Sequence, residues 1–72
     1  MGKKSLFDDE FNSLQNIGET VYICGNTYLS RQVRSAAHHY THSLTRNPQG
    51  KVLSYRKMST GNHRVMLEEF KV

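Results

Sequence analysis

The sequence predicts an α+β fold in a single small domain with the element order α-β-α-β-β. One long stretch carries apolar residues at every third or fourth position. Later, two β-branched and aromatic stretches flank a short polar connection that contains glycine. A length of 72 residues with 36% hydrophobic side chains is enough for one core only. We therefore expect a small antiparallel sheet with one main amphipathic helix packed on one face.

The N-terminal segment predicts a short acidic helix over residues 5–15. Ser5-Leu-Phe-Asp8 has the form of a capping box, in which a hydroxyl accepts the first amide protons of the helix. Phe7, Phe11 and Leu14 then recur at helical spacing, which gives the helix one apolar face.

A strand is predicted over residues 20–24, after Gly18 breaks the first helix. The segment is β-branched and aromatic, and it places Val21 and Ile23 on one face. Residues 20–67 then form the basic α/β part of the domain.

The main helix is predicted to begin at Asn26 or Thr27, either of which can cap it, and to run to about Leu44. Its apolar positions follow steps of three and four: Leu29, Val33, Ala36 or Ala37, Tyr40 and Leu44. The segment Asn47-Pro-Gln-Gly50 then predicts a turn, because proline lacks the amide proton and glycine tolerates a positive φ.

A β-hairpin completes the prediction, with strands over 51–58 and 63–70 around the connection 59–62. Alternation places one set of side chains toward the helix: Leu53, Tyr55, Val65 and Leu67. The other set points away from it: Ser54, Arg56, Arg64 and Met66.

The charge distribution predicts a polyanionic partner. The formal net charge is +4, and all six carboxylates lie outside the stretch from Thr20 to Leu67. That stretch holds all four histidines and most of the basic residues: Arg31, Arg34, Arg46, Lys51, Arg56, Lys57 and Arg64. Nucleic acid is the commonest partner of so segregated a charge. The alternative is a solvated basic surface with no partner.

One row on the main helix, opposite its apolar side, collects hydrogen-bonding and cationic groups: Arg31, Arg34, Ser35, His38 and His42. Arginine pairs bidentately with guanine edges or with phosphates, so this row suits base readout or phosphate anchoring. The alternative is an ordinary exposed helix face.

The hairpin carries a second basic group: Lys51, Arg56, Lys57 and Arg64. A two-stranded ribbon also fits the major groove or lies along a nucleic-acid backbone. Tyr22, Tyr28 and Tyr55 interleave with these bases. If exposed they would stack on unpaired bases and favour a single strand, whereas half-buried positions would give them a structural role.

Metal and cofactor sites are not predicted. His38 and His42 are four residues apart and could share a metal that His63 or Cys24 would complete. No acid or second cysteine lies near them, so we expect these imidazoles to contact phosphate instead. Because histidine titrates near neutrality, binding should strengthen as the pH falls toward 6.

Catalysis is not expected, because the cationic stretch lacks the carboxylates that serve as general bases, histidine orienters and metal ligands. Metal-independent RNA cleavage is the exception, since it needs only histidine, tyrosine and cations. An mRNA-cleaving toxin therefore remains an alternative, with these candidates: His38, His39, Tyr55 and His63.

The single cysteine, Cys24, excludes a disulfide within the chain and favours a reducing compartment, so we expect the cytoplasm. No apolar run approaches the roughly 18 residues of a membrane span, and no signal peptide is expected. A core this small also favours a homodimer, which would double the basic surface.

Three segments together resemble short accessory or early proteins of tailed bacteriophages: Arg34-Ser-Ala-Ala-His-His-Tyr40, Lys51-Val-Leu-Ser-Tyr-Arg-Lys57 and His63-Arg-Val-Met66. Those proteins have an arginine-led alanine helix that ends in an aromatic residue, followed by a basic hairpin. The resemblance covers residues 20–67. It implies action on nucleic acid or on a host protein during infection, with Arg34, Arg56 and Arg64 at the basic positions of the pattern.

The expected function is therefore non-enzymatic binding of nucleic acid, with DNA favoured. The expected contacts are Arg31, Arg34, His38, His42, Arg56, Lys57 and Arg64. The competing class is a phage-encoded inhibitor that binds a host protein through the same basic surface, in the cytoplasm of the host cell.

Overall fold

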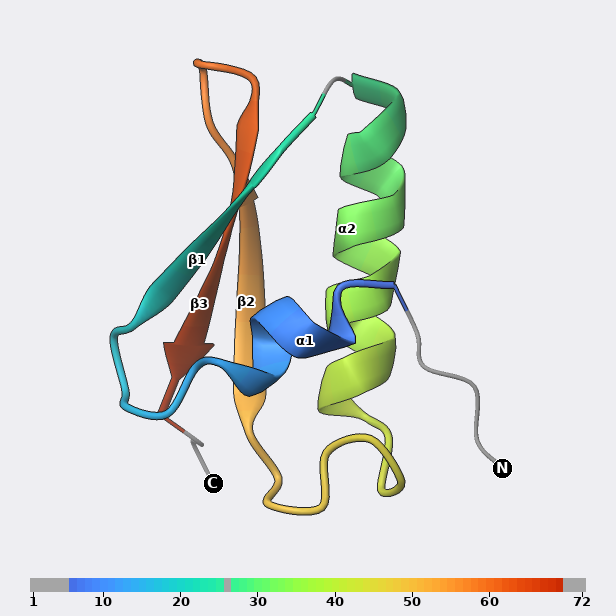
Figure 1. The fold of residues 1–72 in the computed structure, drawn as a ribbon, viewed down its shortest axis with the longest axis vertical. Coiled ribbons are helices and arrows are strands. Elements are labelled where there is room, and N and C mark those ends of the chain that lie inside the picture. Colours follow the sequence, from blue (N-terminus) through green and yellow to red (C-terminus); the bar gives the residue numbers. More distant parts are fainter. Residues whose placement is uncertain (1–5, 26, 70–72) are drawn as a thin grey trace.

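The computed structural model of the protein describes residues 6–25 and 27–69, with residues 27–29 described by their backbone alone. The elements occur in the predicted order: α1 (Asp8–Asn12), β1 (Thr20–Cys24), α2 (Thr27–Thr41), β2 (Val52–Lys57) and β3 (Asn62–Glu68). The three strands form one antiparallel sheet in the order β1-β3-β2. Both helices lie on the same side of this sheet (Figure 1). The predicted α+β fold is thereby confirmed.

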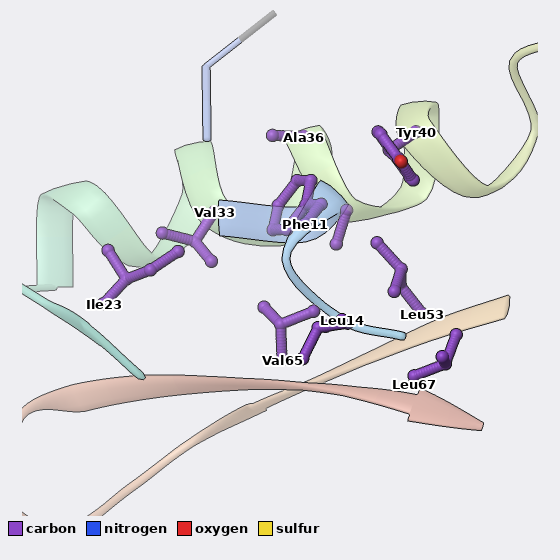
Figure 2. Close-up of a cluster of buried hydrophobic side chains, with 10 residues drawn as sticks. Phe11, Leu14, Ile23, Val33, Ala36, Tyr40, Leu53, Val65 and Leu67 are labelled. Carbon is purple, nitrogen blue, oxygen red and sulfur yellow. The ribbon is translucent and has the colours of Figure 1, made fainter. Parts of the chain in front are cut away.

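The core lies between the sheet and the two helices (Figure 2). Phe11 of α1 inserts beside α2 and meets Tyr40 edge to face, with ring centroids 5.4 Å apart. Both side chains are fully buried, and the Tyr40 hydroxyl donates a hydrogen bond to Asn12 Oδ1. Val65 and Leu67 of β3 close the core from the sheet side. The short helix α1 therefore fills space that α2 alone would leave open.

The first helix is shorter than the predicted range 5–15, because α1 spans only Asp8–Asn12. Phe7 precedes it with a φ of 66°, a left-handed conformation that cannot continue a helix. No side chain among the described residues caps this end, and Ser5 lies outside those residues. Phe11 and Leu14 are buried as the spacing predicted.

The second helix ends at Thr41, so the prediction that it reaches Leu44 was wrong, and Leu44 is 90% exposed. Buried Asn47 determines the path of the chain beyond the helix. Its Nδ2 donates to Thr41 O at 3.3 Å and to Lys51 O at 2.6 Å, and its Oδ1 accepts from Lys51 N at 2.8 Å. These bonds join the end of α2 to the start of β2, which one more helical turn would prevent.

The sheet register confirms the predicted faces, since Leu53 pairs with Leu67 and Tyr55 with Val65 on the side of the helices. We call the opposite side the open sheet face. It consists of Thr20, Tyr22, Cys24, Val52, Ser54, Arg56, Asn62, Arg64, Met66 and Glu68. Within residues 6–25 and 27–69, no helix covers this face. The bounds of β1 are the predicted ones, whereas those of β2 and β3 differ from the prediction by one or two residues, and Phe70 lies outside the described residues.

Charge is distributed unevenly along the strands. At one end Gly18 N donates to Leu67 O at 2.9 Å and Leu67 N donates to Glu19 O at 3.0 Å. These bonds bring Glu19 beside the C-terminal end of β3, where Glu68 and Glu69 follow. We call this end of the sheet the acid end. The other end, next to the β2–β3 turn, carries Arg56, Lys57 and Arg64, whereas Lys51 precedes β2 at the acid end.

Candidate nucleic-acid interface

The predicted contact residues lie on two separate surfaces rather than on one. The first surface, which we call the helix face, is the solvent side of α2 with Arg31, Arg34 and His38, continued by His42 directly after the helix, where His42 N donates to His38 O at 3.2 Å. The second is the open sheet face with Arg56 and Arg64. Because α2 packs its apolar side on the inner side of the sheet, its outer row points away from the open sheet face. A single contact surface made of all the predicted residues does not form.

The helix face is an exposed row of cationic and imidazole groups. All four side chains of this row are exposed. The opposite side of the helix is buried and consists of Val33, Ala36, Ala37 and Tyr40. The rings of His38 and His42 lie close together, with centroids 4.6 Å apart and planes inclined by 55°. No carboxylate occurs anywhere in α2. The row therefore offers several donors and cations to an anion with no competing acid on the helix.

A cleft of about 860 Å³ borders the helix face, between α2 and β2. Arg34, His38 and His42 line its helix side, and Leu53 lies among its apolar residues. Glu68 and Glu69 also line it. Its lining thus carries both signs of charge, and Glu68 and Glu69 compete with an anion on the cleft side of the helix face. The anion therefore binds best on the outer, solvent side of the row.

The open sheet face carries an aromatic and two arginines in one row across the strands. Tyr22 of β1 pairs with Arg64 of β3, and Arg64 pairs in turn with Arg56 of β2. Residues that pair in this way have Cβ atoms roughly 4.5 to 5.5 Å apart. Tyr22 is 53% exposed. The row therefore places a ring face beside two guanidinium groups on the same surface.

Lys57 and His63 point to the other side of the sheet from this row, because they pair with each other and His63 pairs with Ile23. The imidazole of His63 is fully buried. Its Nδ1 lies 2.9 Å from the Tyr55 hydroxyl, and its ring stacks on that of Tyr55 with centroids 5.8 Å apart. Its Nε2 has no hydrogen-bond partner. His63 is thus a core residue that a substrate or metal cannot reach in this structure.

Neither alternative built on histidine finds a complete site in the part of the chain that the structure describes. No three side chains of His, Cys, Asp or Glu come close enough to hold a metal ion there. Cys24 is exposed on the open sheet face. It therefore cannot complete a metal site at His38 and His42, which lie on the opposite side of the domain. The toxin candidates are likewise divided between the exposed helix row and the buried Tyr55–His63 pair.

Tyr22 is the residue that the predicted contact set lacked. The signal for its exposure was present, because inward-facing Val21 and Ile23 force the residue between them outward. Its neighbour could not be read from the sequence, because pairing with Arg64 depends on β3 being the central strand.

Comparison with protein-family models, with curated proteins and with solved structures finds no match for this chain. The resemblance to phage early proteins therefore stays a prediction. Among the described helices, none has the length and apolar character needed to cross a membrane.

Proposed function

We propose that the protein binds nucleic acid without catalysing a reaction on it, with duplex DNA held at the helix face. The observation that carries this proposal is the exposed row of Arg31, Arg34 and His38 on a helix without carboxylates, with His42 exposed directly after the helix. Such a row supplies positive charge and hydrogen-bond donors to phosphates. The major groove of B-DNA admits an α-helix, and α2 spans fifteen residues from Thr27 to Thr41.

The two kinds of side chain contribute differently to this binding. Arg31 and Arg34 each present a planar fork of donors, which pairs bidentately with a phosphate or a guanine edge. His38 and His42, whose rings are 4.6 Å apart, donate single hydrogen bonds to one phosphate group. At 1.5 Å of rise per residue the row from Arg31 to His42 extends about 16 Å along the helix, enough for several consecutive phosphates.

The cellular setting follows from the same proposal. An exposed, single cysteine at Cys24 fits a reducing compartment, which for a phage-encoded protein is the cytoplasm of the host cell. We also propose a homodimer on duplex DNA, because two copies related by a twofold axis would contact two half-sites.

The test is fluorescence anisotropy of a labelled duplex titrated with the protein at several salt concentrations. We expect sub-micromolar affinity near 0.1 M salt and a log–log slope of about 0.9 for each phosphate neutralised. The variant Arg31→Gln/Arg34→Gln should lower that slope by about two. Arg46→Gln is the matched control, because Arg46 is an exposed arginine outside both surfaces.

Two results would contradict the proposal. Affinity weaker than about 100 μM for duplex DNA, single-stranded DNA and RNA alike would exclude nucleic acid as the partner, and a host protein would then be sought by co-purification. An Arg46→Gln loss about half as large as that of the helix-face variant, which removes two charges where Arg46→Gln removes one, would show that only the net charge matters.

A further inference from the structure

We propose that the open sheet face binds a single-stranded nucleic-acid segment, with one base stacked on Tyr22 and the adjoining phosphates held by Arg64 and Arg56. This goes beyond the duplex binding proposed for the helix face, because it assigns a second surface and another strand type. The surfaces lie on opposite sides of the domain, so each can be altered without touching the other.

Tyr22 presents its aromatic ring on the open sheet face. Val21 and Ile23, its neighbours in the strand, both pack toward the core, so the Tyr22 ring points to the open side and remains 53% exposed. The core therefore does not use this aromatic surface. Exposed aromatic rings on a sheet are the platforms on which proteins stack unpaired bases, and every base has a face to stack.

Two arginines continue the row that begins with the Tyr22 ring. Arg64 and Arg56 lie directly opposite each other on β3 and β2, and like charges in that arrangement destabilise a sheet. In the described part of the chain neither guanidinium forms an ion pair or hydrogen bond. A phosphodiester backbone that crosses the strands would relieve this repulsion and satisfy both groups.

Geometry then favours a single strand over a duplex. With neighbouring strands about 4.8 Å apart, the row from Tyr22 through Arg64 to Arg56 extends roughly 10 Å across the sheet. One splayed nucleotide with its flanking phosphates covers such a row. In a duplex the base faces are stacked inside the helix, so the Tyr22 ring could not reach one without local unpairing.

A second copy of the chain fits this face less well. Two copies that met with their rows aligned would bring four arginine side chains together. The residues of the next row, Thr20, Met66 and Ser54, offer little apolar area to offset that repulsion. A polyanion is therefore the occupant to which the charge of the row is complementary.

The test compares three variants for binding to labelled single-stranded DNA and RNA. Tyr22→Phe keeps the ring and should bind like the original protein. Tyr22→Thr, which retains a good strand former, should weaken binding roughly 5- to 100-fold with little change in the salt slope. Arg56→Gln/Arg64→Gln should instead lower the slope by about 1.4, at about 0.7 per phosphate contact with a single strand.

A direct readout comes from Tyr22→Trp, because the chain contains no other tryptophan. Base stacking should quench its fluorescence when single-stranded DNA or RNA is added. Fully paired duplex should leave the emission unchanged, even where anisotropy shows that the duplex has bound elsewhere.

The outcomes separate this inference from the proposed function. Duplex binding that depends on Arg31 and Arg34 together with single-strand binding that ignores Tyr22→Thr would overturn the inference alone. Single-strand binding lost in Arg31→Gln/Arg34→Gln but kept in Arg56→Gln/Arg64→Gln would overturn it as well. Emission of Tyr22→Trp that shifts with protein concentration, in the absence of nucleic acid, would assign the face to a second copy. A greater loss for RNA than for DNA in Tyr22→Thr would support the inference and identify RNA as the strand.

Discussion

The helix face and the open sheet face carry the same sign of charge, yet they differ in the groups that accompany it. On the helix face, Arg31 and Arg34 stand with imidazoles, and Tyr40, the aromatic residue among the described side chains of α2, is buried. On the sheet, Arg56 and Arg64 stand with Tyr22 and no histidine. Charge alone indicates a polyanion on either side. The companion residues distinguish the strand type, because imidazoles add donors for a duplex backbone whereas an aromatic ring needs an unpaired base.

The two faces also differ in how firmly the side chains are placed. Neighbours along the helix row are three and four residues apart on one element. The sheet row is fixed by backbone ladders between three strands, so its ring and guanidinium groups keep a common spacing. We expect the sheet face to discriminate more strongly among ligands of different shape and the helix face to respond more to salt concentration.

Replacing Phe11 by alanine should impair the helix face and the open sheet face together, because one core supports both. Phe11 is fully buried against Tyr40, and loss of such a ring costs about 3 to 5 kcal/mol. We expect a large fall in the urea midpoint and loss of binding to duplex and single strand together. Leu44→Ala is the control, since Leu44 is 90% exposed and should change stability by less than about 0.5 kcal/mol. Separate loss of one binding activity in Phe11→Ala would show that the faces do not share this core.

Asn47→Ala should loosen the helix face relative to the sheet face. Asn47 holds the end of α2 to the start of β2 through bonds with Thr41 and Lys51. Its removal leaves buried backbone groups without partners, which costs about 1 to 3 kcal/mol. Hydrogen exchange should accelerate at the C-terminal turn of α2 more than in β1 and β3. Equal acceleration in all elements would contradict this local role.

The imidazoles of the helix face should distinguish it from the open sheet face. His38→Ala/His42→Ala removes two exposed rings that can donate hydrogen bonds to phosphates. We expect duplex affinity to fall by about 0.5 to 1.5 kcal/mol for each hydrogen bond lost, and single-strand binding at the open sheet face to stay unchanged. Fluorescence anisotropy with duplex and with single-stranded DNA measures both. Duplex affinity equal to that of the original protein would exclude these imidazoles as contacts.

The smallest expected effect concerns Glu19 at the acid end. The backbone amides of Asn16 and Gln15 donate hydrogen bonds to Glu19, which holds the pKa of this carboxyl below its ordinary 4.5. A lowered pKa in the folded state contributes stability above the unfolded value, and that contribution is lost as the pH falls through the folded value. Because Glu19 is exposed, the effect should be small. Urea midpoints measured between pH 6 and pH 3 should fall less in Glu19→Gln than in the original protein or in Glu69→Gln.

The fold was predictable where one local pattern determined it. The spacing of Val33, Ala37 and Tyr40 gave α2 its buried side, and the alternation through Leu53 and Val65 gave the sheet its inner face. The helix ends were not predictable in this way. Leu44 continues the helical spacing, yet the helix ends before it because Asn47 bonds to Thr41 on one side and to Lys51 on the other. The spacing of apolar residues does not reveal these bonds. Phe7 fits the apolar spacing too, yet its left-handed backbone begins the helix one residue later.

The candidate site was predictable residue by residue but not as a surface. Exposure of Arg31 and Arg34 follows from the buried side of α2. The position of Arg56 and half-buried Arg64 on the far side of the sheet follows from strand alternation. Combining the two patterns predicts two opposite surfaces. The alignment of Tyr22 with Arg64 needed the strand order β1-β3-β2, which brings residues distant in sequence into one row.

The acid end of the sheet limits the length of strand that the open sheet face can hold. Arg64 and Glu68 stand four residues apart on β3, about 13 Å along the strand. A bound strand that runs from the arginine row toward Glu68 therefore soon brings one of its phosphates next to a carboxylate, which repels it. The bound segment should then be only a few nucleotides long, with a fixed edge on the Glu68 side. On a long strand, each copy of the protein would cover its own short stretch of nucleotides. Lengthening the oligonucleotide beyond one such stretch should therefore add binding sites but leave the affinity of each site unchanged.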